Sequence, residues 1–187
     1  MESEAQIANS DIEADVSTTE SAAEIPAKVL RLIADITLRF RTLEEAAAVS
    51  SFLGSLCEDP QQEIGIHELL INAVEHGNLE ITYDEKSAFL AAGRMREEID
   101  HRLTLSRYCD RFVTVEVRLT GEGREILIKD EGPGFDFQRF QVFDPARLFH
   151  CHGRGVLLAS AALSIEYLPP GNQVMVRIPD AEQKSEA

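Results

Sequence analysis

Three polar side chains recur at four-residue spacing within one segment: Glu68, Asn72 and His76. On an α-helix this spacing places them in one row, because each residue advances the helix by ~100°. The row offers a carboxylate able to act as a base, an amide oxygen and an imidazole, a set that suits Mg²⁺ and phosphate chemistry. The alternative is an ordinary amphipathic helix whose solvated face also includes Glu75.

A second candidate site follows the apolar residues 126–128, which predict a buried strand. Asp130 comes next, with Gly132 and Gly134 beyond it. A carboxylate at a strand end followed by two glycines makes a bare backbone that a flat, polar ligand can approach closely. The alternative is a plain Asp-Gly turn.

A third candidate is formed by Gly153, Arg154 and Gly155, which precede a predicted helix at residues 156–163. Glycines at a helix start expose N–H groups at the positive end of the helix dipole, where phosphate binds. A single Gly-x-Gly carries little weight on its own.

Two helices precede the second site. Thr42 and Glu45 have capping-box spacing, which predicts a helix from 42 to 56. Pro60 suits the first turn of the next helix, and Gly77 is expected to be its C-cap. This helix carries the row of polar residues.

Alternating apolar and polar residues predict the strands. One is expected over residues 29–40, and a hairpin of 112–120 and 125–129 delivers Asp130. Two last strands are expected at 164–168 and 174–178.

Two segments do not follow these patterns. Residues 81–110 are highly charged and predict a helical insert, with one helical stretch at 85–102. Residues 135–152 have no clean period and contain several phenylalanines, so we interpret them as a lid over a site. An ordinary connection is the alternative, although loops longer than ~12–15 residues are uncommon in compact domains unless they are functional.

The composition limits the class of protein. The net charge is −15, and residues 1–27 hold seven acidic residues and no Lys or Arg. We therefore expect a disordered acidic tail at 1–26, one domain at 27–180 and a frayed end at 181–187. Nucleic acid is not expected as a partner, because phosphate backbones are bound by clustered Lys and Arg. No apolar run is long enough for a bilayer, and three cysteines without a Cys-x-x-Cys pair are typical of a reducing cytoplasm.

Together the three motifs resemble those of a known family. Residues 68–77, with the sequence ELLINAVEHG, are similar to the N-box of Bergerat-fold ATPases, which include gyrase, heat-shock chaperones and sensor histidine kinases. Asp130-x-Gly132-x-Gly134 resembles the G1 box of that superfamily, and Gly153-Arg154-Gly155 its G2 box. The HGRG form and the compact size are most similar to anti-sigma-factor serine kinases. The resemblance covers residues 28–179 and implies an α+β two-layer sandwich, with a mixed, mainly antiparallel sheet covered on one face by helices.

The resemblance also implies roles for the nucleotide-binding residues. Asp130 would accept a hydrogen bond from the adenine amino group, and Gly132 and Gly134 would shape the pocket. Asn72 would coordinate Mg²⁺ through its amide oxygen, with the metal bridging the phosphates of ATP.

The remaining implied roles concern phosphate and its transfer. Gly153 and Gly155 would place backbone amides on the phosphates, with Arg154 nearby. Glu68 matches the general base, which would take the proton of a serine hydroxyl on an anti-anti-sigma partner. His76 would touch phosphate or order Asn72.

The family implies a sigma factor as a further partner and a homodimer. The insert at 81–110 departs from a minimal anti-sigma kinase, and an added helical element there would change the surface that meets a sigma factor. Two other functions stay open: a nucleotide-gated binding module without transferase activity, and a detached histidine-kinase catalytic module acting in trans.

Overall fold

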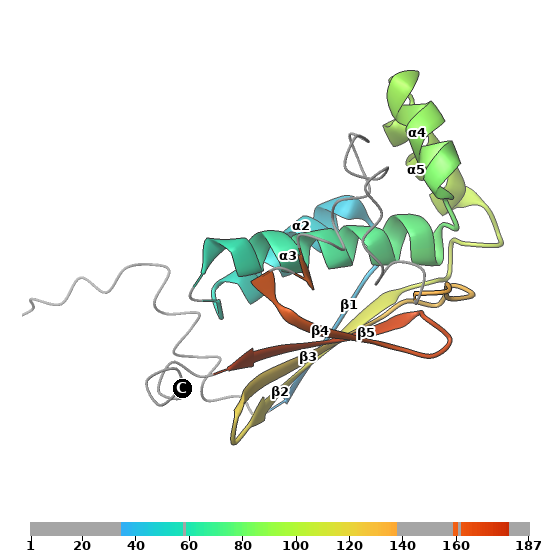
Figure 1. Ribbon diagram of the computed structural model, residues 1–187. Coiled ribbons are helices and arrows are strands. Elements are labelled where there is room, and N and C mark those ends of the chain that lie inside the picture. The colour runs from blue at the N-terminus through green and yellow to red at the C-terminus, as the bar shows by residue number, and fades with distance from the viewer. Residues whose placement is uncertain (1–34, 58, 138–158, 161, 180–187) are drawn as a thin grey trace, which may run out of the picture.

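The computed structural model describes residues 35–57, 59–137, 159–160 and 162–179. In these residues the chain is an α+β structure in which a five-stranded sheet carries helices on one face (Figure 1). The strand order is β1-β2-β3-β5-β4, and every pairing among the described strands is antiparallel, whereas a mixed, mainly antiparallel sheet was expected. The expected tail at 1–26 and the frayed end at 181–187 lie outside the described residues.

The described strands agree with those that the sequence predicts, with small shifts at their ends, and the part of the first strand expected at 29–34 lies outside the described residues. They are β1 (Asp35–Phe40), β2 (Val113–Thr120), β3 (Gly123–Lys129), β4 (Ser164–Leu168) and β5 (Gln173–Pro179). Side chains alternate between the two faces, so Val115, Ile128 and Val174 share a row on the buried face. On the other face Arg177 donates hydrogen bonds to Glu125 and Glu166, which is typical of a solvated surface.

The helices are α2 (Leu43–Gly54), α3 (Pro60–Asn72), the π-helix η1 (Ala73–Asn78), α4 (Tyr83–Ala91) and α5 (Met95–Thr104). The capping box predicted for α2 is confirmed: the Glu45 amide donates to the Thr42 hydroxyl, and the Glu45 carboxylate accepts from the Thr42 amide. Pro60 occupies the first turn of α3, as expected, because its missing N–H is not needed there. No helix in the described part of the chain is both long and apolar enough to cross a membrane.

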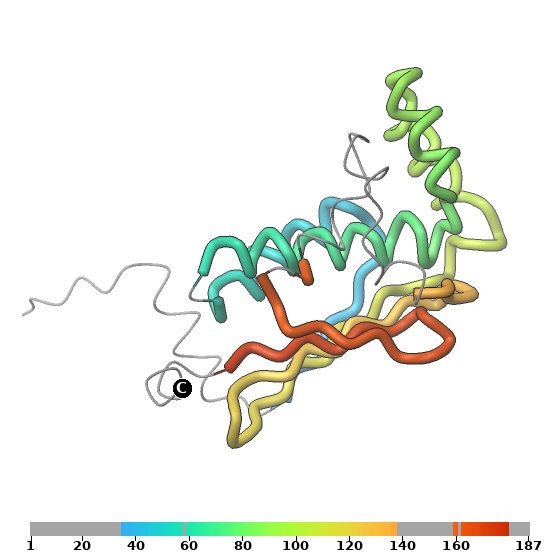
Figure 2. The backbone as a smooth tube through the Cα atoms, in the orientation of Figure 1, coloured from blue at the N-terminus to red at the C-terminus, as the bar shows by residue number. Residues whose placement is uncertain are grey.

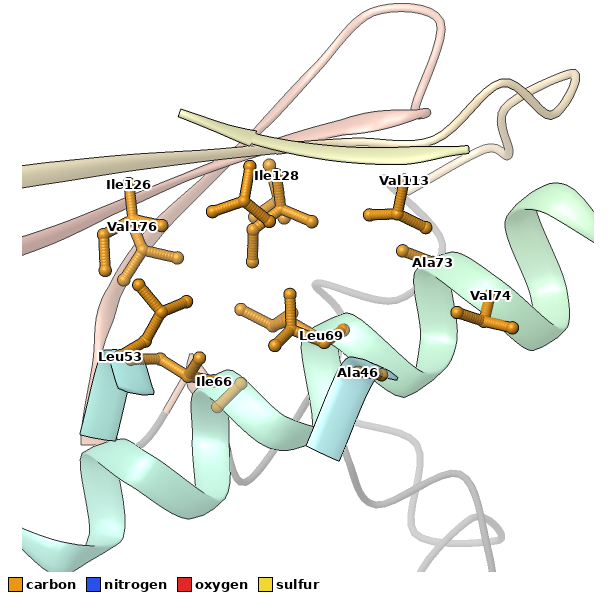
Figure 3. Close-up of a cluster of buried hydrophobic side chains, with 14 of the residues drawn as sticks. Ala46, Leu53, Ile66, Leu69, Ala73, Val74, Val113, Ile126, Ile128 and Val176 are labelled. Atoms are coloured by element: carbon orange, nitrogen blue, oxygen red, sulfur yellow. The ribbon is translucent and has the colours of Figure 1, made fainter. Parts of the chain in front are cut away.

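The core lies between the sheet and the helices α2 and α3 (Figure 3). Leu53 from α2 and Ile66 from α3 point toward Ile126 and Val176 of the sheet, and all four side chains are fully buried. Burying one such side chain contributes about 1.5–3 kcal/mol. Apolar packing therefore fixes α3, the helix with the first candidate site, on the sheet.

The charged insert forms two helices instead of one. Gly93 has a φ of +65°, which ends the first helix and turns the chain into α5. The pair α4–α5 extends away from the body of the protein at the end of the π-helix (Figures 1 and 2). Polar contacts attach it there: Arg102 is buried and donates to the carbonyl oxygens of Leu79 and Glu80 at 2.9 and 3.1 Å.

Candidate functional site

The helix that carries the first candidate site changes its geometry at the site. After Asn72 the α-helix continues as the π-helix η1, so the helix does not end at Gly77 as the sequence suggested. The chain leaves η1 through Leu79 and Glu80. Glu80 takes the left-handed conformation (φ +52°) that was expected at Gly77, the predicted C-cap. Single π-turns of this kind are frequent at functional sites.

Glu68 and Asn72 lie one turn apart on α3, and both are half-buried. Their backbones are held by the regular helix, whose opposite side buries Leu69 and Leu70 in the core. Asn72 offers one amide oxygen to a metal. Mg²⁺ commonly takes one or two protein ligands and completes its shell with phosphates and waters, so this donor fits a Mg²⁺ that arrives with a nucleotide. The described residues contain no group of three or more His, Cys, Asp or Glu that could hold a metal ion.

His76 and Glu75 have structural partners. The Nδ1 atom of His76 is hydrogen-bonded to the carbonyl oxygen of Ile81; because a carbonyl only accepts, Nδ1 carries the proton. Glu75 is 4% exposed and forms an ion pair with Lys86 of α4, so the interpretation that placed it on a solvated face is wrong. The periodicity of the helix could not reveal the burial of Glu75, because α4 of the insert covers the side of the helix that carries it.

The structure brings the second candidate site against the end of this helix. The carboxyl group of Asp130 faces Gly77, where a Cβ atom would lie only 2.6 and 2.7 Å from the two carboxyl oxygens. On the other side, a Cβ at Gly132 would lie 2.7 Å from the carbonyl carbon of Gly77. Glycine is therefore required at both positions for the close approach of the two motifs. Gly77 serves this contact instead of capping the helix.

The loop beyond Asp130 is fixed by hydrogen bonds and by contact with the β4–β5 turn. The amide of Gly132 donates to Oδ1 of Asp130 at 2.8 Å. Gly134 has a φ of +79°, and a Cβ there would lie 2.8 Å from the carbonyl carbon of Pro170. The G1-like motif thus packs between the π-helix and the last hairpin.

Burial raises the pKa of Asp130 to about 6, while the Gly132 amide and the Arg111 guanidinium lower it. The side chain is therefore mostly ionised at neutral pH. An ionised carboxylate accepts hydrogen bonds and donates none, so this site is suited to an amino group of a ligand.

Asn78 and Asn172 also hold this site, although sequence reasoning did not select them. The Oδ1 atom of Asn78 accepts from the Glu131 amide at 2.7 Å, and Nδ2 of Asn172 donates to the Asp130 carbonyl at 3.0 Å. Arg111 supports Asn78 by donating to its carbonyl oxygen at 2.9 Å. The one available signal was the asparagine directly after His76 and Gly77, at the end of the motif.

The lid expected at 135–152 is described only at its first three residues. Phe135 and Phe137 pack on Tyr167 of β4, with ring centroids 5.3 and 5.8 Å from that of Tyr167. Burial raises the pKa of Tyr167 to about 12. Gly153, Arg154 and Gly155 lie outside the described residues.

No family model matches the chain, and no curated protein matches it.

Proposed function

We propose that this chain binds Mg·ATP in the manner of the Bergerat ATPases and acts as an anti-sigma-type serine kinase on an anti-anti-sigma partner protein. The observation that carries the proposal is the contact between two motifs far apart in the sequence. Asp130 of the G1-like motif lies against Gly77, at the end of the helix that carries Glu68 and Asn72.

The setting of Asp130 supports adenine as its ligand. The carboxylate is largely buried, its neighbours Gly77 and Gly132 have no side chains, and a flat ring can approach such a surface. The exocyclic amino group of adenine is a donor that matches the carboxylate, whereas the carbonyl of guanine at the same position would repel it.

The residues on α3 would serve the phosphate end of the nucleotide. Asn72 would hold Mg²⁺ through its amide oxygen; when bound, the metal neutralises phosphate charge. Glu68 would accept the proton of the serine hydroxyl, whose oxygen bonds to the γ-phosphorus as the bond to the bridging oxygen breaks and ADP leaves. Gly153, Arg154 and Gly155 would supply phosphate contacts. His76 would brace the helix end through Ile81, in place of the phosphate contact expected from the sequence.

Glycine substitutions test the nucleotide site. Gly77→Ala would push a methyl group into the Asp130 carboxyl, so Mg·ATP affinity should fall at least about ten-fold, as a displaced charged hydrogen bond predicts. Gly121→Ala is the matched control, because a Cβ there meets nothing within 4 Å. Equal affinities of both variants and the parent in calorimetric titrations would contradict the site.

A phosphotransfer assay tests the reaction. The protein, labelled ATP and a panel of purified anti-anti-sigma proteins should give acid-stable phosphoserine. Glu68→Gln should abolish the label and retain ATP binding. The control is Glu63→Gln, at an exposed acid on the same helix, which should change neither the labelling nor the ATP affinity. Acid-labile phosphate would indicate a histidine-kinase module. ATP-dependent partner binding without any label would indicate a nucleotide-gated binding module.

A further inference from the structure

One peptide unit of the candidate site is hydrogen-bonded on both of its sides by asparagine side chains. The carbonyl of Asp130 accepts from Nδ2 of Asn172 at 3.0 Å, and the amide of Glu131 donates to Oδ1 of Asn78 at 2.7 Å. These two groups belong to the same peptide bond. We call the pair Asn78 and Asn172 the amide clamp.

The clamp joins elements that are separate in the fold. Asn78 is the last residue of η1, and Asn172 lies in the turn between β4 and β5. The amide of Asp130 also donates to the main-chain oxygen of Asn172 at 3.0 Å. Because a peptide unit is planar, fixing its carbonyl and its N–H fixes the whole plane, including the Cα atom of Asp130. The Gly132 amide then fixes the carboxylate itself.

We infer that Asn78 and Asn172 are positioning residues for nucleotide recognition: the amide clamp holds the Asp130 carboxylate in the direction that meets adenine. This inference rests on the proposed ATP site and assigns to it two residues outside the three motifs. It explains why asparagine stands at both positions. The clamp needs an acceptor at 78 and a donor at 172, and the same side chain supplies each with a different atom.

The two asparagines therefore use different side-chain atoms in their hydrogen bonds to the peptide unit. Asn78 is 2% exposed and uses its oxygen, while its Nδ2 is buried without a hydrogen-bond partner in the described part of the protein. Asn172 uses its nitrogen, and its Oδ1 is the buried atom without a described partner. Asn→Asp keeps the shape of the side chain. It preserves the accepting oxygen at position 78 and replaces the donating nitrogen at position 172 with an oxygen.

The test compares two substitutions at each position: Asn78→Asp, Asn78→Leu, Asn172→Asp and Asn172→Leu. At position 78, Leu should weaken Mg·ATP binding more than Asp, because only Asp accepts from the Glu131 amide. At position 172 the order should reverse, because the Asp carboxylate would face the Asp130 carbonyl. Asn172→Asp should lower affinity at least about ten-fold, as expected when a partly buried acceptor loses its donor and faces a carboxylate instead.

Two further measurements separate positioning from general damage. Affinity for Mg·tripolyphosphate, which has no adenine, should be the same in the parent and all four variants. Amide hydrogen exchange at Glu131, measured without nucleotide, should accelerate in Asn78→Leu and stay slow in Asn78→Asp.

The outcomes decide the inference. The same order of Asp and Leu at both positions, or a parallel loss of ATP and tripolyphosphate affinity, would overturn it. A parent that binds no ATP would defeat the proposed function and with it the role toward adenine, whereas the Glu131 exchange rates would still report whether the clamp holds the peptide.

Discussion

The two halves of the helix over residues 60–78 differ in the contacts that hold them. The α-helical half buries Ile66, Leu69 and Leu70 against the sheet and holds its place by apolar packing. The π-helical half also buries Ala73 and Val74 in the core, and beside them it buries Glu75 and Asn78, which are held by an ion pair and a hydrogen bond. Apolar packing stabilises both halves. The π-helical half also carries buried polar groups, which lower the stability of the fold unless they are paired.

A large effect is expected in the apolar half. Leu70 is completely buried, so Leu70→Ala should lower the free energy of unfolding by about 2–5 kcal/mol, from lost burial and the cavity that remains. Urea denaturation measures this. Leu119→Ala, at a side chain that is 46% exposed, is the control and should cost only about 0.5 kcal/mol. Similar costs at the two leucines would contradict the assignment of the core.

A gain in stability is expected at Asp130, which lies against the polar half. Burial raises the pKa of Asp130 to about 6 from its usual 3.8, so ionisation costs more in the folded protein than in the unfolded chain. This cost is absent below pH 3.8, grows between pH 3.8 and 6 and is complete above pH 6. Asp130→Asn should therefore stabilise the nucleotide-free protein by on the order of 2–3 kcal/mol at pH 7.5.

The pH dependence separates this explanation from others. Unfolding free energies of parent and Asp130→Asn, measured from pH 4 to pH 8, should converge at the acid end. A gain that is constant over the range would show that the charge of Asp130 is not its cause.

A further loss of stability is expected where the insert supports the polar half. Lys86→Met would leave the Glu75 carboxylate buried without its ammonium partner, at a cost of about 3–5 kcal/mol. Adding Glu75→Gln should recover part of that loss, because a neutral pair needs no counter-charge. A double variant less stable than Lys86→Met alone would show that the ion pair is not the cause.

Elements set by local rules and apolar packing could be predicted from the sequence, whereas the buried polar contacts could not. The capping box of Thr42, the position of Pro60 and the hairpin that delivers Asp130 were all confirmed, because local rules and apolar periodicity decide them. The contact between Asp130 and the end of the helix was implied only by the order of the motifs. Periodicity reports which face is buried and says nothing of the partner that covers it.

The polar half could not be predicted in the same way. A π-turn changes the helical period over six residues, too few for a pattern to reveal. The pairing of Glu75 with Lys86 depends on how the insert folds. The insert splits at Gly93, which lies inside the stretch 85–102 that was expected to form one helix. The amide clamp joins Asn78 to a loop far along the chain, and single asparagines in turns carry no such signal.

The central claim is that Asp130 recognises the amino group of adenine, and a double comparison in calorimetric titrations tests it most directly. The parent and Asp130→Asn are titrated with Mg·ATP and with the Mg complex of purine ribonucleoside triphosphate, which lacks the 6-amino group. The parent should prefer ATP by about 10- to 100-fold, as expected for a hydrogen bond to a charged group. Asp130→Asn should lose that preference. A variant that binds ATP as tightly as the parent, with the preference intact, would contradict the account.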